Sequence, residues 1–110
     1  MNIAVREKLR KYLNEYNKVE KNSIFEKNYK TTRFRGLIMY FLYKENLRKN
    51  IKLTLSEIAT IFNIKSHSTV IHSIQKTEKY IQKPLLLGKN ERIKYTYLVY
   101  TFNKILNDLI

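Results

Sequence analysis

The sequence predicts an all-α fold, a single compact helical domain of about five to six helices with a helix-turn-helix over about residues 54–82. Apolar side chains recur three and four residues apart along most of the chain, which is the spacing of one face of an α-helix. The chain has 110 residues, the size of one domain, and its 2 Gly and 1 Pro are too few for the frequent turns of a β-sandwich. Hydrophobic residues form 44% of it, enough to build a core.

The first half of the chain contains two predicted helices. The first covers about residues 2–17, and its apolar stripe consists of Val5, Leu9, Tyr12, Leu13 and Tyr16. A polar connector follows, in which a short helical turn at about 22–26 would bury Ile24 and Phe25. The second helix is predicted over about 32–46.

A capping box marks the start of the next helix. Thr54 and Glu57 have the spacing at which each side chain accepts a hydrogen bond from an otherwise unpaired backbone amide. The helix they begin is predicted to end at a turn over 63–65, and its core face is Ile58, Ile61 and Phe62.

Ser66 is the predicted N-cap of the second helix of the helix-turn-helix. This helix is expected to run to about Gln82, because Pro84 cannot continue it. A last helix is predicted over about 90–110, and it would bury Leu98, Phe102, Ile105 and Leu109.

The helix that follows Ser66 has two sides of different polarity. The predicted core side carries Val70, Ile74, Thr77 and Ile81, with Ile71 at its edge. The opposite side carries Ser68, Thr69, His72 and Lys76, with Lys65 and His67 at the N-terminal tip. Short donors and acceptors reach base edges and cations reach phosphates, and the first residues of such a helix contact the bases. The pattern predicts a recognition helix for the DNA major groove.

The charge of the chain favours a polyanionic partner. Its formal net charge is +13, from 22 Lys and Arg against 9 Asp and Glu. Between Lys27 and Lys52 there are eight basic residues and one acidic residue, and a basic loop containing Arg48 and Lys49 is predicted over 46–52. A composition rich in residues with AT-rich codons explains part of the lysine excess, but it does not explain this clustering.

Several classes of protein are disfavoured. The chain has no Cys, and no apolar run approaches a signal peptide or the roughly 18 residues of a membrane span, so we expect a cytoplasmic protein. His67 and His72 are five residues apart and do not share a helix face as a metal pair would. The only Asp, Asp108, lies far from them along the chain. We therefore expect no enzyme activity, metal, cofactor, small-molecule substrate or membrane association.

Three strings of residues then suggest a family. They are RFRGLIMY at 33–40, LSEIATIF at 55–62 and KSHSTVIH at 65–72. Their order and spacing resemble the C-terminal DNA-binding domain of DnaA, the bacterial replication initiator, over about residues 5–107. The resemblance implies that domain's Trp-repressor-like helical fold and its binding to double-stranded DNA.

The resemblance also implies roles for single residues. Arg35 matches an arginine that enters the minor groove beside the recognition site. Three residues match positions that contact bases in the major groove, namely His67, Ser68 and Thr69. Two match positions that face the DNA backbone, namely His72 and Lys76.

The chain departs from the family pattern in three places. Ser66 stands where the family has Asp, and serine caps a helix equally well but reads a cytosine amino group weakly. Lys65 replaces an arginine and keeps its charge without its planar fork. The segment 44–54 is longer and more basic than in the family, which makes it a candidate for additional phosphate or minor-groove contacts.

The replication initiator also has an ATPase module, whereas this chain contains no Gly-x-x-x-x-Gly-Lys-[Ser/Thr] phosphate loop. We therefore expect a stand-alone DNA-binding domain without ATPase activity, as in a plasmid, a phage or another mobile element, with a monomer slightly favoured.

Two classes of function remain open. The first is a sequence-specific binder of double-stranded DNA that marks a replication-origin-like or regulatory site. Its predicted contacts are Arg33, Arg35, Arg48, Lys49, Ser56, Lys65, Ser66, His67, Ser68, Thr69, His72 and Lys76. The second is a protein–protein interaction module that docks through its apolar C-terminal helix. The 9 tyrosines could stack on single-stranded bases, but at helical spacing they are more often half-buried core residues.

Overall fold

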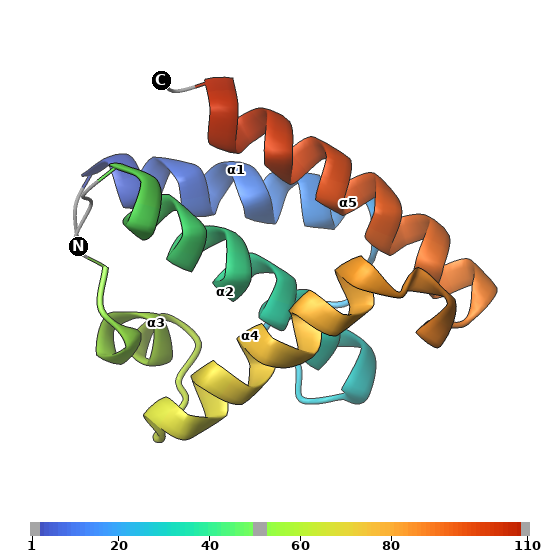
Figure 1. Cartoon of the computed structure of the whole chain (residues 1–110), viewed down its shortest axis with the longest axis horizontal. Helices are drawn as coiled ribbons and strands as arrows, with labels where there is room; N and C mark the ends of the chain where they lie inside the picture. The colour runs from blue at the N-terminus through green and yellow to red at the C-terminus, as the bar shows by residue number, and fades with distance from the viewer. Residues whose placement is uncertain (1–2, 50–52, 109–110) are drawn as a thin grey trace.

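The computed structural model describes residues 3–49 and 53–108, with side chains described for 3–44 and 53–107. Within these ranges the chain forms five α-helices, one short 3₁₀ helix and no strand, which confirms the predicted all-α class. The helices are α1 (Ile3–Val19), α2 (Tyr29–Lys49), α3 (Leu55–Ile61), α4 (His67–Gln82), η1 (Pro84–Leu86) and α5 (Lys89–Asp108). In Figure 1, α1, α2 and α5 run alongside one another, α3 lies on the other side of α2 from α5, and α4 runs from α3 past α2 toward the start of α5.

The core lies where α1, α2 and α5 meet. The ring of Tyr12 in α1 lies 6.1 Å from that of Phe41 in α2 and 4.7 Å from that of Phe102 in α5, measured between centroids. Lys8 is buried beside them, and its ammonium donates to the main-chain oxygen of Leu106 at 3.4 Å, which offsets part of the cost of burying it. The predicted stripe of the first helix faces this core, with Leu9 and Leu13 partly buried and Val5, Tyr12 and Tyr16 fully buried.

Helix α2 is longer than predicted at both ends. At its start, the Asn28 side chain accepts a hydrogen bond from the Thr31 amide at 3.0 Å, and the Asn28 amide donates to the Thr31 hydroxyl at 3.3 Å. Residues 46–49 continue the helix because they include no Gly or Pro and contain good helix formers. The predicted loop over 46–52 is therefore wrong in its first part, and residues 50–52 lie outside the described ranges.

The connector before α2 differs from its predicted structure. Residues 22–26 form a turn and bends instead of a helical turn, and the Ser23 hydroxyl accepts a hydrogen bond from the Phe25 amide at 3.2 Å. Ile24 is buried as predicted, but Phe25 is 52% exposed, with its ring 6.1 Å from that of Phe62. Adjacent side chains point in different directions, so one short turn cannot bury both.

The predicted capping box is present at the start of α3. The Glu57 amide donates to the Thr54 hydroxyl at 3.1 Å, and the Thr54 amide donates to the Glu57 carboxylate at 3.3 Å. On the predicted core face of α3, Ile58 and Phe62 are buried and Ile61 is partly buried.

Residues 62–66 join α3 to α4. Asn63 has a φ of 54°, in the left-handed region that asparagine tolerates, and the Ile64 amide donates to the Ala59 oxygen at 2.8 Å. Ser66 occupies the N-cap position of α4 with an extended backbone, as predicted, but its hydroxyl makes no capping hydrogen bond. The hydroxyl is thus left for other partners.

Helices α2 and α4 cross at close range. A Cβ placed on Gly36 would lie 2.8 Å from the Thr77 hydroxyl oxygen and 3.2 Å from the main-chain oxygen of Ser73. Only glycine lets the two backbones approach this closely. Val70, Ile74 and Thr77 are buried along the inner side of α4, while Ile81 is partly buried and Ile71 is exposed, which confirms the predicted inward stripe and its edge.

Helix α5 begins and ends within two residues of its predicted bounds, as far as the described residues extend. Leu98 and Phe102 are buried as predicted, Ile105 is only partly buried, and the adjacent Leu106 is buried instead. Leu109 lies outside the described residues.

Candidate nucleic-acid interface

The outer side of α4 presents polar side chains to solvent along the first two-thirds of the helix. The six residues predicted there are all exposed, namely Lys65, His67, Ser68, Thr69, His72 and Lys76. None of these side chains has a hydrogen bond or ion pair with another described residue. The structure therefore brings these predicted residues together on one accessible surface, which we call the outer face of α4.

The two predicted serines lie beside this face. Ser66 is exposed at the N-cap of α4. Ser56 is exposed in the first turn of α3, where its main-chain oxygen accepts a hydrogen bond from the Thr60 hydroxyl at 3.0 Å. Because α3 packs against α4, both serines belong to the same pair of helices.

The Arg35 side chain is hydrogen-bonded within the protein. One nitrogen of its guanidinium donates to the oxygens of Ile24 at 2.9 Å and Glu26 at 2.8 Å, and another donates to the Thr32 hydroxyl at 2.9 Å. Burial of the guanidinium lowers the pKa of Arg35. The residue matched to a minor-groove arginine thus holds the connector before α2 in place, and it would have to exchange these bonds to reach DNA.

Arg33 is also paired, on the other side of α2. Its guanidinium forms an ion pair of 2.6 Å with Glu91 of α5, and this hydrogen bond raises the pKa of Arg33. It also lies 5.4 Å from the ring centres of both Tyr29 and Tyr80, within cation–π range. Arg33 therefore ties α2, α4 and α5 together.

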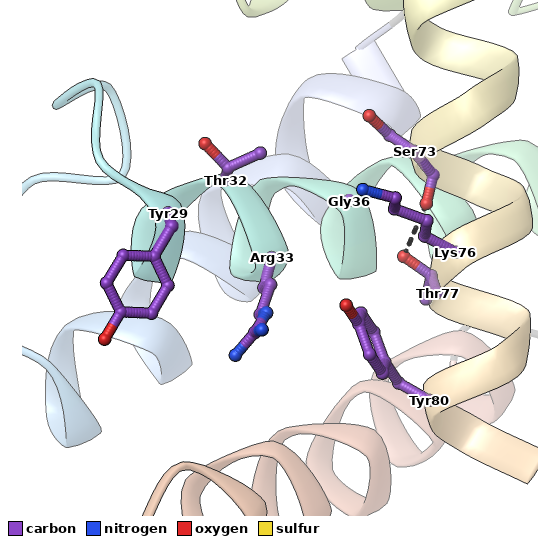
Figure 2. Close-up of a pocket in the computed structure, with 8 residues that line it drawn as sticks. All are labelled: Tyr29, Thr32, Arg33, Gly36, Ser73, Lys76, Thr77 and Tyr80. Carbon is purple, nitrogen blue, oxygen red and sulfur yellow. Dashed lines mark hydrogen bonds between the residues drawn. The ribbon is translucent and has the colours of Figure 1, made fainter. Parts of the chain in front are cut away.

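A hollow of about 290 Å³ opens between α2 and α4, next to the outer face of α4. Helix α2 contributes the glycine at the helix crossing and Arg33, and α4 contributes Lys76 (Figure 2). The complete lining is Tyr29, Thr32, Arg33, Gly36, Ser73, Lys76, Thr77 and Tyr80. Sequence reasoning picked out Arg33 and Lys76 but missed Tyr29, Ser73 and Tyr80, since only the crossing at Gly36 brings them together.

Two predicted contacts lie at the C-terminal end of α2. Arg48 and Lys49 belong to the last turn of α2, but their side chains lie outside the described ones. Their backbone is helical, so the prediction that they stand in a loop is corrected.

The described ranges lack two further kinds of feature. There, no three His, Cys, Asp or Glu side chains gather as a metal site requires. No helix in those ranges combines the length and the apolar character needed to cross a membrane.

Comparison of the chain with family models, with curated proteins and with solved structures finds no match. The likeness to the DnaA domain accordingly rests on the three strings of residues at 33–40, 55–62 and 65–72.

Proposed function

We propose that the protein binds double-stranded DNA in a sequence-specific way, with the N-terminal part of α4 in the major groove. The observation that carries this proposal is the outer face of α4, where hydroxyls, imidazoles and ammonium groups are exposed and have no partner in the described part of the chain. Side chains of these types reach base edges and phosphates. The crossing at Gly36 packs the helix that carries this face closely against α2.

The electrostatics support the same proposal. The net charge of +13 draws the protein to a polyanion, and Lys65, Lys76 and Lys79 line the exposed side of α4. With the likeness to the DnaA domain, this favours a protein that marks a replication-origin-like or regulatory site, without ATPase activity, metal or cofactor.

The first test is binding to duplex DNA over a range of salt concentrations, followed by selection of binding sites from random duplexes. We expect affinity to fall steeply with salt, because lysine–phosphate contacts release counterions. Thr69→Ala should lower affinity for the selected site by about 1–3 kcal/mol and have little effect on random DNA. Binding that is unchanged at several hundred millimolar salt, or a site selection that yields no motif, would contradict sequence-specific recognition.

Ser66→Asp sharpens the test of base reading. Asp is also a good N-cap and the Ser66 hydroxyl makes no capping bond, so the fold should be unaffected. The variant should favour sites with cytosine at the facing position, because a carboxylate accepts from the cytosine amino group. If wild type and variant select identical motifs, Ser66 does not face a base.

A second function remains open because α5 exposes an apolar stripe. Ile93, Tyr97 and Tyr100 recur at helical spacing and are 61%, 39% and 64% exposed. A protein–protein interaction module would use this surface. Thr69→Ala would then leave its activity intact, whereas Tyr100→Ala would reduce partner binding.

A further inference from the structure

The hollow between α2 and α4 is too small and too open to enclose a whole small molecule. Its volume of about 290 Å³ lies at the lower limit of ligand pockets, which span roughly 300–1,000 Å³. It is formed by side chains from two helices whose spacing is fixed by Gly36. A hollow of this size can hold one chemical group of a longer ligand, while the rest of the ligand extends beyond it.

The charges in the hollow favour an anionic group. Arg33 is neutralised by Glu91 at 2.6 Å, whereas Lys76 has no ion pair among the described side chains. The uncompensated charge of Lys76 at the rim therefore sets the sign of the local potential.

The hydroxyls that line the hollow differ in whether they already donate a hydrogen bond within the protein. The Thr77 hydroxyl donates to the Ser73 oxygen at 2.9 Å, and the Thr32 hydroxyl donates to the Asn28 oxygen at 2.8 Å. The Ser73 hydroxyl has no hydrogen bond to another described residue and can donate to a ligand, whereas Figure 2 shows the Tyr29 hydroxyl pointing away from Ser73 and Lys76.

The position of the hollow connects it to the outer face of α4. Lys76 lies one helical turn after His72 and about two turns after Thr69, on the same exposed side, and it also lines the hollow. A strand that follows this face therefore passes the mouth of the hollow.

We propose that the hollow seats one backbone phosphate of the bound duplex, with Lys76 as its cation and the Ser73 hydroxyl as a donor. The ring of Tyr80 then lies against the adjoining deoxyribose. This inference rests on the proposed function, since it needs a duplex on the outer face of α4. It adds Ser73 and Tyr80 to the contacts, with the phosphate as the target of Ser73 and the adjoining sugar as the target of Tyr80.

The experiment replaces single phosphates of the selected duplex, one at a time, by neutral methylphosphonates and measures affinity. With wild type, neutralising the seated phosphate should weaken binding about tenfold or more, the worth of a hydrogen bond to a charged group. With Lys76→Ala, the same substitution should cost roughly twofold or less, because its main partner is gone. Ser73→Ala should reduce the penalty partially at the same position.

Lys79→Ala is the matched control, because Lys79 is also exposed on α4 but does not line this hollow. This variant should lose overall affinity while keeping the wild-type penalty at the seated phosphate. If the penalty profile of Lys76→Ala equals that of wild type at every position, the hollow seats no phosphate, while duplex binding itself stands. If wild type binds no duplex at all, both proposals fall.

A second arm separates a backbone phosphate from a free one. Inorganic phosphate and a mononucleotide are each titrated into the protein, and the amide resonances of Gly36, Ser73 and Thr77 are followed. We expect weak binding, in the millimolar range, that competes with the duplex. Micromolar binding of the mononucleotide without loss of duplex affinity would overturn the assignment to DNA and make the hollow a nucleotide site.

Discussion

The outer face of α4 and the N-terminal part of α2 both carry residues that the sequence predicts as DNA contacts, yet the structure uses them differently. On α4, Thr69, His72 and Lys76 are exposed and have no partner among the described side chains. On α2, Arg33 is paired with Glu91, and Arg35 holds the oxygens of Ile24 and Glu26. The formal charge of the chain therefore overstates the charge that is available to a ligand. A ligand can use the side chains that have no partner inside the protein, and among these two regions they lie on α4.

Among the variants that test this comparison, the largest effect on stability is expected from Gly36→Ala, which changes the point where helices α2 and α4 cross. The added methyl would lie 2.8 Å from the Thr77 hydroxyl and 3.2 Å from a backbone oxygen that cannot easily move. We expect the free energy of unfolding to fall by about 1–3 kcal/mol, as for other overpacked sites. Urea unfolding followed by circular dichroism measures it.

Gly88→Ala is the matched control, because a Cβ there meets nothing within 4 Å. Its effect on unfolding should be close to zero. Equal stability of the two alanine variants would mean that α2 and α4 cross less closely than the structure has them.

The next effect concerns Arg35. Arg35→Ala removes two hydrogen bonds to the connector and one to Thr32 of α2, so we expect a loss of about 1–2 kcal/mol in the free energy of unfolding. Arg35→Lys keeps the charge but loses the fork, and it should recover only part of that stability. Lys30→Ala, which removes an exposed cation from the same helix, should leave stability unchanged.

DNA affinity measured on the same variants decides how Arg35 acts. If it only holds the connector, Arg35→Lys keeps the wild-type salt dependence. A large loss of affinity with an unchanged free energy of unfolding would instead mean that Arg35 leaves the connector to contact DNA.

The smallest effect is expected from Glu91→Gln, which removes the charge that neutralises Arg33. The ion pair is partly exposed, so its loss should lower the free energy of unfolding by only about 0.5–1 kcal/mol. Releasing Arg33 beside the hollow should raise affinity for random duplex DNA and steepen its salt dependence. Fluorescence anisotropy at several salt concentrations measures both.

Glu7→Gln provides the comparison, since it releases Arg10 from a similar ion pair of 2.9 Å on α1. It makes the same change in net charge away from the hollow. If both variants bind random DNA equally well, the position of Arg33 does not matter and only the net charge does.

Features set by near neighbours in the chain were predictable from the sequence. The capping box of Thr54 and Glu57 depends on residues three apart, and the inward stripe of α4 depends on helical spacing alone. The early start of α2 also has a local cause, the reciprocal bonds of Asn28 and Thr31, and a search for asparagine caps would have found it.

Features set by distant partners were not predictable. Arg33 and Glu91 are 58 residues apart, and nothing in the sequence marks either as the other's partner. The hollow likewise exists only because α2 and α4 cross at Gly36. The outer face of α4 was predictable because residues there need only be exposed, whereas the roles of Arg33 and Arg35 depend on tertiary contacts.

The buried pairing of α1 with α5 has a consequence for synthesis. Tyr12 needs Phe102 against its ring, and Lys8 needs the Leu106 oxygen, so the part of helix α1 that faces α5 stays uncovered until α5 has left the ribosome. At roughly 5–20 residues per second, the nascent chain carries that uncovered side for several seconds. Helix α4 emerges before α5 does, so the surface proposed to bind DNA leaves the ribosome ahead of the helix that completes the core.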